Sequence, residues 1–261
     1  FSWLLYQGGG YQHTPLTHGP LQFHLIALSY AIFGDTDTAA RIPHALAGAA
    51  ALAVLWLFRR YSGRSGALVT AFLLLISPFI LYYSRYARNE AFVVLFGLVT
   101  IWALLRYLDS GQARYLFWLT LATVLHFTAK ETAFIYTAQV LIFSGLLWLN
   151  AITRKPWQKP SYRVAFILLL IFAAVLISLA LGVAAFEQPV EGQVSATASL
   201  SRLSGGLGLL AGLLSIYFLL RGYGIQTLRQ ERTFDVMILL LTLVLPQLAP
   251  FPMVLAGLDP L

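Results

Sequence analysis

The sequence contains no cysteine and few charged residues. Without cysteine the chain can form no disulfide bond, no iron–sulfur cluster and no thiolate metal site. Charged residues make up 10% of the 261 residues, whereas soluble domains carry about 25%. Hydrophobic residues make up 59%, and the mean hydropathy is +0.77. These values exclude a soluble globular domain and predict an all-α, polytopic membrane protein.

The chain is divided into apolar runs by short polar connections. A helix needs roughly 17 to 25 mostly apolar residues to cross the hydrocarbon core. Seven runs lie at 42–58, 67–83, 91–108, 114–128, 131–150, 164–186 and 234–257, and a shorter, glycine-rich run lies at 207–220. We therefore predict a bundle of seven or eight transmembrane helices. An earlier run at 20–33 is shorter and contains His24, so we expect a juxtamembrane or re-entrant helix there.

The net charge of +7 comes from arginine and lysine in the connections. Because these residues do not lie on one solvated face, we predict no nucleic-acid partner. They are concentrated in every second connection, which the positive-inside rule places in the cytoplasm. They are Arg59, Arg60, Arg64, Arg106, Arg114, Arg154, Lys155, Lys159, Arg163, Arg221, Arg229 and Arg232. The other connections then face outward, with 1–41 as part of an outer loop and 42–261 as the transmembrane domain.

The first of three polar clusters in the outward connections extends from 11 to 48. It contains His13, His18, His24, Asp35, Asp37, Arg41 and His44. Histidine and aspartate together can ligate a divalent cation or exchange protons, although this spacing matches no standard metal motif. In the structural interpretation, Asp35 caps a turn after Gly34 and Arg41 anchors the chain at the interface.

The second cluster is the segment YYSRYARNEAF at 82–92. Arg85 and Arg88 can hold a phosphate through their forked donors, and Glu90 can orient an arginine, accept a proton or bind a metal. The alternative is an interfacial belt of tyrosines, which membrane boundaries attract. Two arginines with a carboxylate on the outward side oppose the positive-inside bias, which favours a functional site.

The third cluster is the segment HFTAKETAF at 126–134. His126 and Lys130 are four residues apart and share a face if the helix continues. Lys130 and Glu131 lie in a very short connection between two apolar runs, which disfavours an ordinary solvent-exposed turn. A structural Lys–Glu pair is one interpretation; an intramembrane lysine beside a histidine also suits an anionic lipid headgroup.

Taken in order, these clusters resemble the protein O-mannosyltransferase-like branch of the GT-C membrane glycosyltransferases. The closest likeness is to the bacterial and archaeal family described as flippase-activity-associated proteins. It is carried by HGPLQFHLIALSYAIFGDTDTAARIPHALAG at 18–48, LISPFILYYSRYARNEAF at 75–92 and TAKETAF at 128–134. From residue 150 onward the chain is similar to the family only as generic transmembrane sequence.

The resemblance implies a glycosyltransferase that uses a polyprenyl-phosphate-linked sugar at the outer face of a prokaryotic cell membrane, the inner membrane in bacteria. The acceptor is then a protein or a glycolipid. Arg85, Arg88 and Lys130 would contact the lipid phosphate, and Glu90 would occupy the acidic position after the SR motif. His13 and His18 would lie beside the acceptor pocket. Supporting positions are Asp35, Asp37, Arg41, His126 and Glu131.

The family's acidic motif in the first outer loop should precede the HGPL segment. We therefore expect the general base and the first transmembrane helix upstream of Phe1, and any extramembrane domain beyond Leu261. Within the chain, Glu90 and His18 are the candidate catalytic residues, and a divalent cation is a candidate cofactor whose ligands are unassigned.

Two other functions remain compatible with the same residues. A lipid-linked sugar translocase, or its accessory subunit, would hold the phosphate without chemistry. A structural subunit of a larger membrane complex would carry the clusters only as interfacial residues. The apolar runs do not distinguish these functions from the enzyme.

Overall fold

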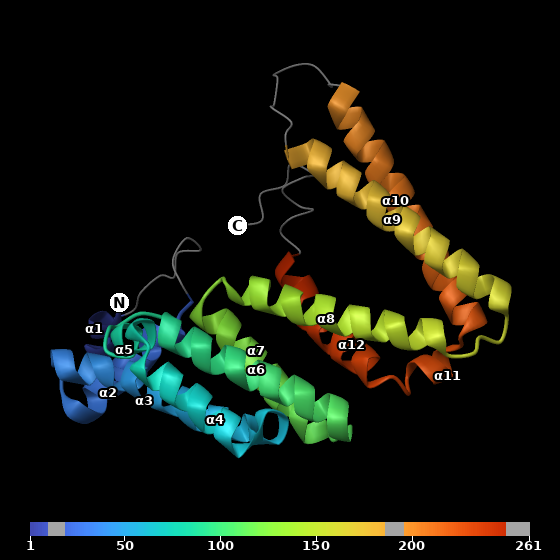
Figure 1. The fold of residues 1–261 in the computed structure, drawn as a ribbon. Coiled ribbons are helices and arrows are strands. Elements are labelled where there is room, and N and C mark those ends of the chain that lie inside the picture. Colours follow the sequence, from blue (N-terminus) through green and yellow to red (C-terminus); the bar gives the residue numbers. More distant parts are fainter. Residues whose placement is uncertain (10–18, 186–195, 249–261) are drawn as a thin grey trace. The chain divides into compact units, whose positions relative to one another are not determined.

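The computed structural model describes residues 1–9, 19–185 and 196–248, and all regular elements in these ranges are helices (Figure 1). The chain divides into two compact units. The first unit comprises Phe1–Gly145 and Asp235–Leu261, and the second comprises Leu146–Phe234. The prediction of an all-α membrane protein is confirmed.

The predicted apolar runs all lie on helices, although the last run is described only as far as residue 248. In chain order the elements are α1 (Ser2–Tyr6), α2 (Leu21–Phe33), α3 (Asp37–Leu55), η1 (Trp56–Phe58), α4 (Arg59–Ile76), α5 (Pro78–Tyr83), α6 (Glu90–Ser110), α7 (Ala113–Ala129), α8 (Ala133–Arg154), α9 (Pro160–Ala185), α10 (Ala196–Gly222), α11 (Ile225–Leu228), α12 (Arg232–Val244) and η2 (Leu245–Leu248).

Five helical segments are long and apolar enough to cross a membrane. They are Asp37–Ile76, Glu90–Ser110, Ala133–Arg154, Pro160–Val183 and Ser199–Gly222. These segments contain six of the eight predicted runs, wholly or in large part, because Asp37–Ile76 holds two runs on either side of a break at Gly63. The φ of Gly63 is 74°, a conformation that glycine adopts without steric cost. The other two runs lie on α7, with 17 residues, and on α12, with 13.

The short run before the first span forms α2, a helix of 13 residues. At a rise of about 1.5 Å per residue, it extends about 20 Å and is too short to cross the bilayer. It is held against α3 by a hydrogen bond of 2.6 Å from Ser29 Oγ to the carbonyl of Ala39. The residue that caps α3 is Thr36 rather than Asp35, because Thr36 has the extended backbone of a cap and accepts a hydrogen bond from Ala39 N.

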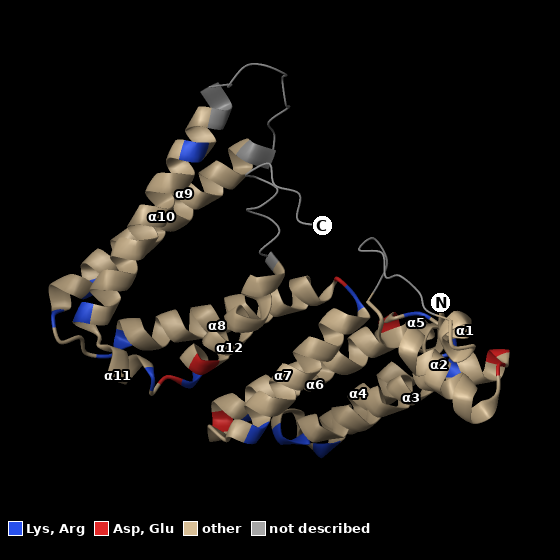
Figure 2. Ribbon diagram, turned by 180° about the vertical axis from the view of Figure 1, so that it is seen from behind, with Lys and Arg blue, Asp and Glu red and all other residues tan. Residues whose placement is uncertain are grey.

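Charged residues in the first unit lie at the ends of its helices, as Figure 2 shows. α3 packs on α6 and α6 packs on α7. At one end, the Tyr61 hydroxyl donates to Asp109 at 2.9 Å and Arg60 lies 3.5 Å from the same carboxylate. The basic connections at 59–64 and 106–114 therefore meet, as their assignment to one side of the membrane requires. Glu90 begins the opposite end of α6, about 30 Å away along the helix.

The second unit is built on α9 and α10, which pack side by side along their length (Figure 1). Ser215 Oγ donates to the carbonyl of Phe166, and at one end Gln158 N donates to the carbonyl of Gly222 at 2.9 Å. This second bond joins the basic connections at 154–163 and 221–232, which the charge pattern also assigns to one side. Leucines along both helices are exposed, as expected of surfaces that face lipid.

Candidate functional site

Three charged side chains from two predicted clusters meet at the start of α6, and we call them the ion cluster: Arg88, Glu90 and Lys130. Lys130 Nζ donates to Glu90 Oε1 at 2.9 Å, and Arg88 Nη2 lies 3.4 Å from the same oxygen. The side chains of Lys130 and Glu90 are each 16% exposed, whereas that of Arg88 is 48% exposed. Two cations thus share one carboxylate oxygen, and Arg88 is the more accessible of the two.

Lys130 reaches Glu90 because α7 ends one residue earlier, at Ala129. The backbone of Lys130 is extended, with φ −157° and ψ 144°, while its amide donates to the carbonyl of His126 at 2.9 Å. The helix therefore does not continue to Lys130, which was the condition for His126 and Lys130 to share a face. The His126 ring is buried, 4.8 Å from the ring of Tyr136, and packs within the helices rather than in the ion cluster.

α2 fixes the two segments that carry the ion cluster. The buried Gln22 donates from Nε2 to the carbonyl of Ala87 at 2.6 Å, which anchors the loop before Glu90. Just before α2, Gly19 lies so close to α7 that a Cβ would be 2.1 Å from the carbonyl oxygen of Thr128. Sequence reasoning missed both residues. Gln22 could have been identified from its position as a lone amide on an apolar helix. A buried amide needs a hydrogen-bond partner, which here had to come from another segment.

The ion cluster retains hydrogen-bonding groups that no protein group uses. Among the described residues, Glu90 Oε2, Asn89 Oδ1 and Thr132 Oγ1 are buried without a hydrogen-bond partner. Buried polar atoms in proteins are almost always hydrogen-bonded. Asn89 precedes Glu90 and Thr132 follows Lys130 by two residues, so these unpartnered atoms belong to the two segments that carry the ion cluster.

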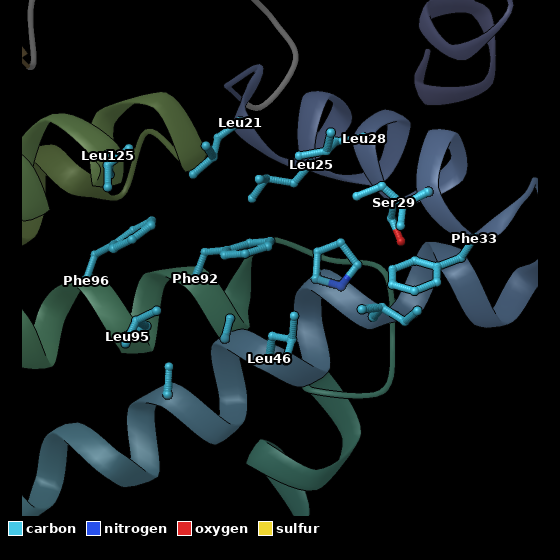
Figure 3. A pocket seen from close by; sticks show the side chains of 15 residues that line it. Leu21, Leu25, Leu28, Ser29, Phe33, Leu46, Phe92, Leu95, Phe96 and Leu125 are labelled. Atoms are coloured by element: carbon cyan, nitrogen blue, oxygen red, sulfur yellow. The ribbon is translucent and has the colours of Figure 1, made fainter.

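An apolar cavity of about 490 Å³ begins within one helical turn of the ion cluster. In Figure 3, Leu21 and Leu25 of α2 lie on one side of it and Phe92 and Phe96 of α6 on the other. Its lining is apolar except for Ser29, whose hydroxyl already donates to Ala39. Its volume is in the range of ligand sites, about 300–1,000 Å³. The site therefore combines cations with a space for an apolar chain.

The remaining predicted site residues either make none of the contacts described above or lie outside the described residues. His13 and His18 belong to the latter group. Those that the structure describes as exposed are His24, Asp35, Asp37, Arg41, Arg85 and Glu131. His44 is fully buried, with its ring 5.0 Å from that of Phe92. In the described ranges, no group of three or more His, Asp or Glu side chains is placed to hold a metal ion.

Apolar spans with charges confined to their ends define a helical integral membrane protein. The lipid bilayer is therefore one of its partners. The family model described as dolichyl-phosphate-mannose-protein mannosyltransferase matches residues 17–178, and the chain belongs to this family of GT-C-type membrane glycosyltransferases. The match covers the ion cluster and the cavity, and it confirms the resemblance seen in the sequence. No curated protein and no solved structure matches the chain.

Proposed function

We propose that the protein transfers a sugar, mannose by its family, from a polyprenyl-phosphate carrier to a protein or glycolipid acceptor at the outer face of a prokaryotic cell membrane. One observation carries the proposal: two cations converge on one carboxylate oxygen beside an apolar cavity. A polyprenyl-phosphate sugar has a phosphate for the cations and an isoprenoid chain for the cavity. A nucleotide sugar has no apolar chain to occupy that space.

In this proposal Arg88 and Lys130 bind the phosphate, and the exposed Arg85 of the same loop adds a third contact. Negative charge develops on the phosphate as the sugar leaves, and fixed cations stabilise that charge in the transition state. Glu90 orients both cations through Oε1. Because this oxygen is already shared, we assign Glu90 to orientation rather than to proton abstraction. The general base is assigned to the outer segment before α2, where His18 is the candidate within this chain.

The isoprenoid chain is proposed to enter the cavity beneath α2. Replacing Ala47, a buried residue in its lining, with phenylalanine should fill part of the space. We expect KM for a long-chain donor to rise about tenfold, because even one or two methylenes of apolar contact are worth about 1–3 kcal/mol. The matched control is Ala49→Phe, two residues further along α3 at an exposed position. Initial rates against donor concentration measure the effect; equal KM values in both variants would remove the cavity from the donor site.

The proposed activity is tested with the protein at its natural length, reconstituted into vesicles with a radiolabelled polyprenyl-phosphate mannose or a nucleotide-linked mannose. We expect label on an acceptor, with release of polyprenyl phosphate, from the lipid-linked donor alone. Donor added on the side of the ion cluster should react without crossing the bilayer. Movement of the labelled lipid between leaflets without any glycosylated product would instead support a translocase.

A further inference from the structure

The basic end of the second unit has an excess of positive charge that the proposed transfer does not use. Its two connections, 154–163 and 221–232, hold one acidic residue, Glu231. The seven basic residues in them are Arg154, Lys155, Lys159, Arg163, Arg221, Arg229 and Arg232. All seven are exposed. The single carboxylate cannot neutralise this group.

The position of Glu231 further limits what it can neutralise. The residue is buried and accepts hydrogen bonds from Lys155 Nζ and from the Tyr223 hydroxyl. Burial raises the pKa of Tyr223, and the bond to Glu231 raises it further, so the phenol remains a donor at neutral pH. Glu231 is therefore committed to its contacts with Lys155 and Tyr223, and it does not neutralise the exposed Lys159 and Arg221.

A backbone hydrogen bond joins the two connections that carry Lys159 and Arg221. Gln158 N donates to the carbonyl of Gly222, and Lys159 and Arg221 are the residues next to these two partners in the chain. Gly222 packs so closely that a Cβ would lie 2.7 Å from the ring of Trp157. Trp157 is itself buried and donates from Nε1 to the carbonyl of Ile152 at 2.8 Å.

Both cations also lie over tyrosine rings that belong to one aromatic belt. Lys159 Nζ is 5.0 Å from the centroid of Tyr162, and Arg221 Cζ is 5.8 Å from that of Tyr217. The ring of Phe218 connects the two, at 5.2 Å from Tyr162 and 5.5 Å from Tyr217. Tyrosines and cations with apolar stems are typical of the level of lipid headgroups.

We propose that Lys159 and Arg221, on this belt, bind the phosphate of an anionic phospholipid from the surrounding leaflet. Phosphate pairs well with an arginine fork and a lysine ammonium, and basic clusters at the ends of spans attract anionic lipids. The apolar residues just inside the belt, among them Val164 and Ile216, are exposed and provide a surface for the acyl chains. This location favours a lipid over a free phosphate ion. The proposal does not depend on sugar transfer.

Native mass spectrometry of the detergent-solubilised protein, titrated with phosphatidylglycerol or phosphatidylcholine, tests this site. We expect the wild type to retain phosphatidylglycerol in preference to phosphatidylcholine. The double variant K159Q/R221Q should lower the retained fraction by about tenfold, since each basic group near a lipid headgroup adds to its binding. Retention equal to the wild type in K159Q/R221Q would overturn the proposal.

Two controls separate the site from general charge and from misfolding. R59Q/R60Q removes two cations from the basic end of the first unit and should leave the preference unchanged; an equal loss there would indicate an unspecific charge effect and overturn the proposed site. K159R/R221K keeps both charges and should retain the lipid. Inorganic phosphate should not displace the lipid, and displacement would instead assign the site to a free anion.

Discussion

Replacing Lys130 with methionine is expected to lower kcat/KM for sugar transfer from a polyprenyl-phosphate donor by about 100- to 1,000-fold. Methionine keeps an unbranched apolar stem but removes the ammonium that lies 2.9 Å from Glu90. The transition state then loses its most enclosed cation, since Arg88 is far more exposed. Initial rates in vesicles containing equal amounts of protein measure the effect.

Transfer by K130M can fall because the transition state loses a cation or because the structure around Glu90 is destabilised. A second substitution distinguishes these two causes. Without Lys130, Glu90 remains as a largely enclosed carboxylate beside Arg88 alone, which destabilises the local structure. In K130M/E90Q that charge is also removed, so stability should recover while transfer stays low. Full recovery of transfer in the double variant would mean that Lys130 only neutralises Glu90. R64Q, at the basic end of the first unit, is the matched loss of a cation and should transfer at the wild-type rate.

Gly19→Ala is expected to have the second large effect. The added Cβ would lie 2.1 Å from the carbonyl oxygen of Thr128, and a clash with backbone cannot be relieved by a side-chain rotation. We expect the free energy of unfolding to fall by about 1–3 kcal/mol. Transfer should fall by about 100-fold, because a displaced α2 moves Gln22 and the loop that it anchors. Thermal unfolding and initial rates measure the two effects.

Gly145→Ala is the matched control for this substitution. Gly145 lies in α8, and a Cβ built there meets no heavy atom within 4 Å. Because alanine favours the helix by up to about 1 kcal/mol over glycine, the variant should be as stable as the wild type or slightly more stable. If G19A matched G145A in both measurements, the close approach of Gly19 to α7 would not contribute to the site.

The helices could be predicted from the sequence because the bilayer fixes their length and polarity. The run at 91–108 is the helix Glu90–Ser110, and that at 131–150 is Ala133–Arg154. The alternation of charge carried further information. It assigned 59–64 and 106–114 to one side, and these connections do meet, through Tyr61 and Asp109.

The contacts that build the site could not be predicted in the same way. Glu90 and Lys130 are forty residues apart, and their pairing depends on an extended backbone at Lys130. The sequence contains no glycine or proline beside Lys130 that would predict this conformation. Nor does hydropathy distinguish Gln22, which anchors a distant loop, from a tolerated polar residue on an apolar helix. Such contacts depend on the approach of separate helices, which local patterns do not encode. The roles of Arg85, Arg88, Glu90 and Lys130 in binding stay predictions.

The connection between α7 and α8 consists only of Lys130, Glu131 and Thr132. Losing one residue within α7 would rotate everything after it by about 100° and shift it by about 1.5 Å. Three residues leave little slack to absorb that change, so the ammonium would point away from Glu90. Related sequences that keep this site can thus vary the side chains of α7 freely on its lipid-facing surface, but insertions and deletions should be excluded from that helix.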